Sequence, residues 1–92
     1  DQIREIKQQI DVSISPENPK PGENVTITVE AYGLDLDSTN IQWTVNGKEA
    51  LKGLGEKRFT FTAVGGLENK ILLNIYPTKQ PKISKSFVFN PS

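Results

Sequence analysis

Cysteine, histidine and methionine are all absent from this chain of 92 residues. Without histidine and cysteine there is no imidazole base, no thiolate nucleophile and no usual ligand for zinc, haem or an iron–sulfur cluster. Ser-His-Asp and Cys-His catalytic groups therefore cannot form, and acid–base chemistry would depend on carboxylates alone. We expect no enzyme activity and no cofactor.

Because the chain starts at Asp1 and not at methionine, we also expect it to be a fragment of a longer protein.

An excess of charge of one sign is also lacking, since 11 basic residues balance 11 acidic residues. A nucleic-acid binder of this size would carry a clear basic excess. No run approaches the roughly 20 apolar residues that span a membrane, so we expect no membrane insertion. Alanine is scarce, while isoleucine, valine and threonine are frequent, and this balance favours strands over helices.

Alternation of apolar and polar residues with a period of two predicts about seven short strands, separated by turns rich in glycine, proline and asparagine. An Asn46-Gly47 dipeptide predicts a tight hairpin, and Gly53-Leu54-Gly55 is expected to end the short strand that follows. The expected strands are 10–15, 25–31, 41–45, 49–51, 58–63, 70–76 and 83–89. This pattern predicts an all-β, immunoglobulin-like antiparallel sandwich over residues 10–92. Residues 1–9 have isoleucines at helical spacing, so they are either a polar linker or the end of a preceding helix or stalk.

Three motifs resemble immunoglobulin-like modules of bacterial and archaeal surface proteins, with PKD-like domains as the nearest named group. They are Pro19-Lys-Pro21-Gly22 before the second strand, Ile41-Gln-Trp43-Thr-Val45-Asn-Gly47 in the third, and Gly53-Leu-Gly55 before Phe59-Thr-Phe61. The resemblance covers residues 14–76. The chain departs from it in having no cysteine pair beside the tryptophan and only part of the W-D-F-G-D-G core of PKD domains.

The resemblance implies an extracellular or cell-surface location and a structural role. We expect a non-catalytic spacer module, one unit of a tandem array, whose partners are neighbouring domains of the same chain. Two alternatives stay open: a recognition module for adhesion that binds carbohydrate or a protein through its loops, and an accessory domain of a secreted enzyme. An exposed aromatic cluster or a deep pocket would favour recognition.

A calcium site is the one metal hypothesis that the sequence raises. Asp35, Asp37 and Asn40 place oxygen side chains at positions i, i+2 and i+5 of one loop. Calcium needs six to eight oxygen ligands, and this loop supplies three without a closing glutamate. We therefore expect no metal here, and we interpret the loop as one in which Asp and Asn side chains form local turn hydrogen bonds.

The aromatic residues divide into one that we expect in the core and two that we expect at the surface. Trp43 shares the phase of the apolar residues of its strand, so it is predicted to be buried. Tyr32 and Tyr76 fall in the outward phase at strand ends, where a carbohydrate platform is the functional interpretation and packing over a sheet edge is the simpler one.

Lys70, Lys79, Lys82 and Lys85 follow the last acidic residue without compensation. An anion-binding surface is one interpretation, but lysines on an edge strand also prevent edge-to-edge pairing, and we prefer that explanation. With this protection we expect a monomer at micromolar concentration. The sequence also contains one glycosylation sequon, Asn24-Val25-Thr26, which matters only in a eukaryotic secretory protein.

The charges are divided unevenly along the chain. Residues 1–46 hold 3 basic and 8 acidic side chains, and residues 47–92 hold 8 and 3. Strands from the two halves alternate in an immunoglobulin-like sandwich, so opposite charges should meet within one molecule. For the second and fifth strands we predict an antiparallel register that pairs Val25 with Ala63, Thr26 with Thr62, Ile27 with Phe61, Thr28 with Thr60, Val29 with Phe59 and Glu30 with Arg58.

Overall fold

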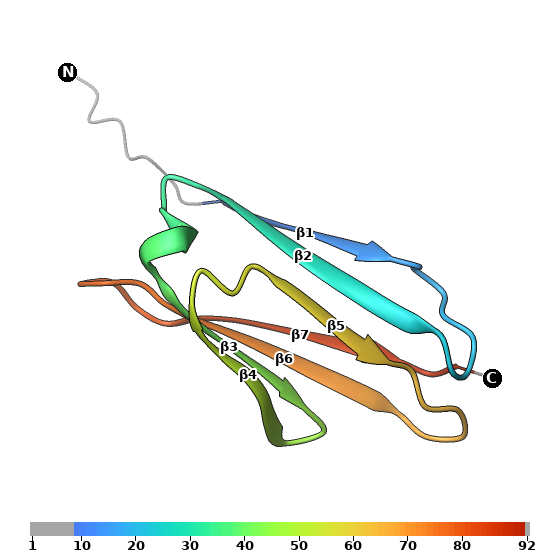
Figure 1. The fold of residues 1–92 in the computed structure, drawn as a ribbon. Helices are drawn as coiled ribbons and strands as arrows, with labels where there is room; N and C mark the ends of the chain where they lie inside the picture. The colour runs from blue at the N-terminus through green and yellow to red at the C-terminus, as the bar shows by residue number, and fades with distance from the viewer. Residues whose placement is uncertain (1–8, 92) are drawn as a thin grey trace.

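The computed structural model describes residues 9–91, which form two antiparallel sheets packed face to face (Figure 1). The expectation for residues 1–9 lies outside the described residues, except that Gln9 already belongs to the first strand. The elements are β1 (Gln9–Ser15), β2 (Asn24–Tyr32), the 3-10 turn η1 (Leu36–Ser38), β3 (Asn40–Val45), β4 (Lys48–Leu54), β5 (Arg58–Thr62), β6 (Asn69–Tyr76) and β7 (Ile83–Phe89).

The two sheets contain three and four strands. The first sheet has the order β1-β2-β5, and the second has the order β4-β3-β6-β7. Strands that are distant in sequence are therefore neighbours, as in an immunoglobulin-like sandwich whose fourth strand lies beside the third. The structure is an all-β sandwich of seven strands, and this confirms the fold class. Within residues 9–91 no helix is long and apolar enough to cross a membrane.

The core lies between the sheets and is built from the inward-facing residues of every strand. Trp43 is fully buried, as the alternation predicts, and its ring stacks on Phe59 with 5.2 Å between ring centroids. The stack continues from Phe59 to Phe61, and Phe61 also contacts Phe89. A row of aromatic rings therefore connects β3, β5 and β7 across the space between the sheets.

The β3–β4 hairpin forms where the Asn-Gly dipeptide predicts it. Asn46 and Gly47 both have positive φ, 48° and 84°, which is the backbone conformation of a two-residue hairpin turn. The expected end of the fourth strand at Gly53 is wrong, because β4 continues to Leu54 and Gly53 pairs with Ile41. A register shift between Trp43 and Thr44 absorbs one extra residue of β4.

The predicted pairing of β2 with β5 is confirmed, but its register is wrong by two residues. Ile27 lies opposite Phe59 and not opposite Phe61, and Thr28 lies opposite Arg58. The stack of Phe59 on Trp43 explains this register, because the contact between the two rings holds β5 two residues away from its predicted position along β2. A shift of two residues keeps every apolar side chain facing inward, so the alternation alone cannot distinguish the two registers.

The outward-facing polar residues of β2 and β5 therefore form different cross-strand pairs from those predicted. Thr26 and Thr60 lie opposite each other with 3.0 Å between their hydroxyl oxygens, and the hydroxyl of Thr62 donates a hydrogen bond to the amide oxygen of Asn24. Glu30 has no cross-strand partner on β5, so the predicted Glu30–Arg58 ion pair does not form.

The first and last strands begin and end at opposite ends of the sandwich. Gln9 pairs with Tyr32, at the end that carries η1, whereas Phe89 pairs with Asn69 at the other end. Figure 1 shows β1 and β7 running in the same direction, in different sheets. A chain that enters through β1 therefore leaves through β7 about one strand length away.

Candidate functional site

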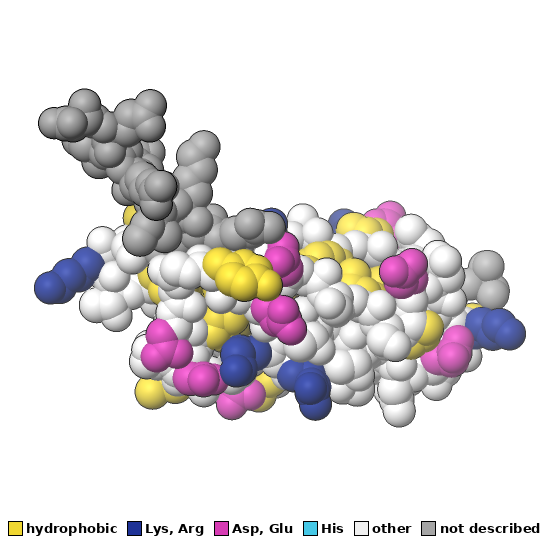
Figure 2. Space-filling model, turned by 90° about the horizontal axis from the view of Figure 1, so that it is seen from above, with side chains coloured by type: hydrophobic (Ala, Val, Ile, Leu, Met, Phe, Trp, Pro, Cys, Tyr) yellow, Lys and Arg dark blue, Asp and Glu magenta, His cyan; other side chains and the backbone are white. Residues whose placement is uncertain are grey.

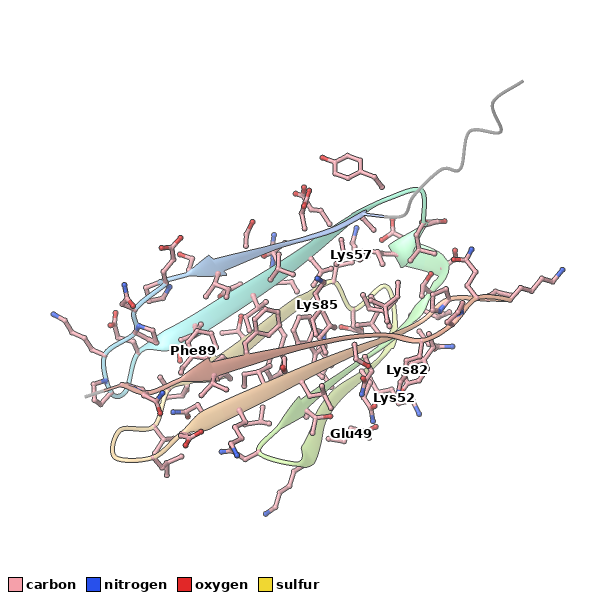
Figure 3. The ribbon with its side chains drawn as sticks, turned by 180° about the vertical axis from the view of Figure 1, so that it is seen from behind. Glu49, Lys52, Lys57, Lys82, Lys85 and Phe89 are labelled. Atoms are coloured by element: carbon pink, nitrogen blue, oxygen red, sulfur yellow. The ribbon has the colours of Figure 1, made fainter. Side chains whose placement is uncertain are left out.

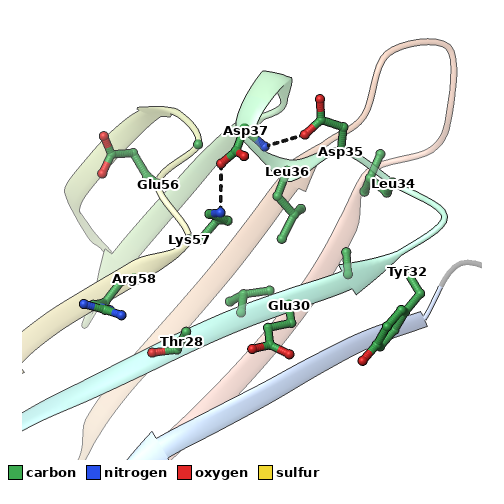
Figure 4. Close-up of a pocket in the computed structure, with 13 residues that line it drawn as sticks. Thr28, Glu30, Tyr32, Leu34, Asp35, Leu36, Asp37, Glu56, Lys57 and Arg58 are labelled. Atoms are coloured by element: carbon green, nitrogen blue, oxygen red, sulfur yellow. Dashed lines mark hydrogen bonds and ion pairs between the residues drawn. The ribbon is translucent and has the colours of Figure 1, made fainter.

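A groove of about 680 Å³ lies where β5 begins, beside the end of β2 (Figure 4). The last backbone bond that joins the two strands at this end runs from the N–H of Val29 to the carbonyl of Lys57. Beyond it, the chain before β5 turns away through Gly55 and leaves a gap beside the end of β2. The walls of the groove are the last residues of β2, the η1 turn and residues 55–58.

Two of the three calcium candidates line this groove, and each of their carboxylates has another partner. Asp35 precedes η1, where its side chain accepts hydrogen bonds from the Asp37 backbone N–H at 3.1 Å and from the Ser38 hydroxyl at 3.0 Å. The carboxylate of Asp37 forms an ion pair with Lys57 at 2.8 Å. Asn40 is the first residue of β3. Among residues 9–91 there is no group of three or more acidic side chains placed to hold a metal ion.

We expect calcium to leave the stability of the domain unchanged. A calcium ion would have to displace both the turn hydrogen bonds of Asp35 and the Lys57 ammonium from Asp37. Thermal unfolding followed by circular dichroism should give the same midpoint in EDTA and in millimolar calcium. A calcium-dependent rise of several degrees, absent in Asp37→Asn, would contradict this and would restore Asp35, Asp37 and Asn40 as ligands.

The two tyrosines are exposed, as their phase predicts, but they do not form one platform. Tyr32 is 60% exposed beside the groove, at the end of β2 in the three-stranded sheet. Tyr76 is 39% exposed at the end of β6 in the four-stranded sheet. They therefore stand at the same end of the sandwich on its two opposite outer faces.

A second surface, on the outer face of the four-stranded sheet, has no motif in the sequence. Here side-chain hydrogen bonds cross all four strands: Ser84 donates to Asn74, Asn74 and Tyr76 both donate to the amide oxygen of Gln42, and Gln42 donates to Glu49. The contacting atoms are 2.7–3.3 Å apart. We call this row the polar ladder. Because its members lie up to 42 residues apart in sequence, only the strand order brings them together.

Of the four lysines, Lys79, Lys82 and Lys85 lie on or next to an edge strand, as the edge-protection hypothesis requires, whereas Lys70 lies on the inner strand β6. Lys79 and Lys82 lie in the loop before β7, and Lys85 lies on β7, which is an edge strand. Lys85 occupies the inward-facing row, on the side of β7 that faces the other sheet (Figure 3). Both acidic and basic side chains are exposed on the side of the molecule that Figure 2 shows.

No protein-family model matches this chain, and no curated protein is significantly similar to it.

Proposed function

We propose that this domain is a structural spacer module of a larger extracellular or cell-surface protein. The observation that carries the proposal is the placement of the start of β1 and the end of β7 at opposite ends of one folded sandwich. In a tandem arrangement each such module adds its own length along the chain. Neighbouring domains of the same chain are its partners, and no catalytic step is involved.

The packing supports a stiff unit. Most inward-facing residues of β2, β3 and β6 are almost completely buried, with Ala31 and Val45 partly buried at the strand ends, and the aromatic row connects three strands. Within residues 9–91 every buried side-chain nitrogen and oxygen has a hydrogen-bond partner. Satisfied buried polar groups favour one well-defined native state over several alternatives.

The proposal is tested by the distribution of distances between the two ends. Because the chain has no cysteine, Tyr32→Cys and Asn90→Cys together provide two unique sites for spin labels at exposed positions. We expect one narrow distance, on the order of 30 Å from the strand rise. A broad or bimodal distribution in the folded protein would contradict a rigid spacer.

The polar ladder supports a second candidate function, recognition of carbohydrate. Exposed Tyr76 lies beside amide and carboxylate groups on one open sheet face, and sugar hydroxyls hydrogen-bond to such groups. A glycan array tests this candidate. Binding that is lost in Tyr76→Ala and kept in Tyr32→Ala, on the opposite face, would favour recognition. Absence of binding by the wild-type chain would remove this candidate.

A further inference from the structure

The sandwich has four edge strands, and three of them carry features that oppose pairing with another strand. β4 contains a register shift and two exposed lysines, Lys48 and Lys52. β5 has only five residues and begins with Arg58. β7 places Lys85 in its inward-facing row. Bulges, short length and charged residues of these kinds protect the edges of natural sheets.

The remaining edge, β1, has no bulge, no basic residue and no charged residue in its inward-facing row, and its one charged residue, Asp11, lies on the outer face. It is seven residues long, pairs with β2 in an unbroken register, and contains no lysine, arginine or proline. Its inward-facing side chains, Ile10, Val12 and Ile14, are only partly buried, whereas Ile27 and Val29 in the paired row of β2 are fully buried. β1 is therefore the edge that is most open to another strand.

The backbone of β1 directs a regular set of free groups outward. The N–H of Val29 bonds to Lys57, so the odd-numbered residues of β2 direct their backbone groups toward β5. The even-numbered residues of β2 then bond to the odd-numbered residues of β1. As a result, the N–H and C=O groups of Ile10, Val12 and Ile14 point away from the sheet. None of them has a partner among the described residues.

We propose that the free edge of β1 binds β1 of a second copy of this chain, in antiparallel orientation about a two-fold axis at Val12. In this register Val12 meets Val12 of the other copy, and Ile10 meets Ile14. In all three pairs the two residues can exchange backbone hydrogen bonds with each other, because their N–H and C=O groups already point outward. The two three-stranded sheets then form one continuous sheet of six strands.

The side chains of β1 fit this symmetric register. Asp11, the charged residue of the strand, lies opposite Ser13 of the other copy, so no acidic residue directly faces another. The chain has no net charge that would keep two copies apart. One strand pair is a small interface, so we expect a dissociation constant on the order of 0.1 mM. The isolated chain is then a monomer at micromolar concentration, and the dimer forms where copies are crowded together.

The first test follows the wild-type chain from micromolar to millimolar concentration. Sedimentation should show a reversible monomer–dimer equilibrium. Hydrogen exchange measured by NMR should show protection of the amides of Ile10, Val12 and Ile14 that increases with concentration. A chain that stays monomeric at 10 times the expected dissociation constant, or a dimer that protects other edges, would overturn the proposal.

The second test places proline at an outward-pointing N–H. Val12→Pro removes a bond needed for the dimer but no bond to β2, and proline is tolerated at such edge positions. Thr60→Pro is the matched control, because Thr60 lies on β5 with its N–H also pointing away from β2. We expect Val12→Pro to weaken dimerisation about tenfold or more and Thr60→Pro to leave it unchanged. The reverse pattern would identify β5 as the interface and overturn the proposal.

Discussion

Trp43→Ala should lower the free energy of unfolding by roughly 3–5 kcal/mol, the range observed for truncation of a buried aromatic residue. Trp43 is fully buried and stacks on Phe59. Its indole N–H also donates a 2.8 Å hydrogen bond to the carbonyl of Glu56, which fixes the segment that leads into β5. The substitution therefore removes core volume and the contact that sets the position of β5 along β2.

Trp43→Phe separates these two contributions. It keeps a ring against Phe59 but leaves the carbonyl of Glu56 without its donor, so we expect a smaller loss of about 1–3 kcal/mol. Both variants are measured by urea denaturation followed by circular dichroism, because the tryptophan signal is lost. Native wild-type fluorescence at the wavelength of solvent-exposed tryptophan, or a loss below about 1 kcal/mol in Trp43→Ala, would contradict this account of the core.

Asn69→Ala should lower the free energy of unfolding by roughly 2–4 kcal/mol, a large loss for a polar residue. Asn69 is 2% exposed, and its side-chain amide holds the turn before β6 and the end of β7 together. It accepts a bond from the N–H of Val64 and donates to the carbonyls of Val64, Leu67 and Phe89. Alanine would leave these backbone groups without their partner.

Asn74→Ala is the matched control for this prediction. Asn74 is also a buried asparagine on β6, but its bonds go to the side chains of Ser84 and Gln42, which can turn toward water. We expect a loss of about 1 kcal/mol from this change. Thermal and urea unfolding of the two variants should give clearly different stabilities. Equal losses would show that the hydrogen bonds of Asn69 to backbone groups contribute no more stability than the hydrogen bonds of Asn74 to side chains.

The strands and the hairpin turn were predictable because their signals are local. Alternating residues such as Ile10, Val12 and Ile14 identify a strand and the face that it buries, whatever its neighbours are. Asn46-Gly47 identifies the hairpin because both positions need positive φ. The extension of β4 through Gly53 was not predictable in the same way, because pairing on one side, with β3, outweighs the weak strand preference of glycine.

The register of β2 with β5 depends on contacts that no local pattern contains. Registers that differ by two residues place the same apolar residues inside, and the choice is made by the stack of Phe59 on Trp43 from the opposite sheet. The same reason explains the polar ladder. Gln42 and Asn74 look like ordinary polar positions of two strands, and only the adjacency of β3 and β6 makes them partners.

For the two tyrosines and the two aspartates, the sequence predicts the local features but not the contacts between strands. Alternation places Tyr32 and Tyr76 at the surface, as the structure shows, but the division of their strands between two sheets decides that they face apart. The turn hydrogen bonds of Asp35 agree with the expected loop interpretation. The pairing of Asp37 with Lys57 depends on the approach of the segment before β5, which the sequence does not reveal.

Stretching a single molecule between its two chain ends tests the proposed spacer role most directly. Pulling at the start of β1 and the end of β7 applies force along these strands, in shear against β2 and β6. Many backbone hydrogen bonds between the strands therefore resist the force together. We expect one cooperative rupture, with an added length of about 3.6 Å for each residue released. Gradual extension at low force, strand by strand and without one cooperative event, would contradict the account.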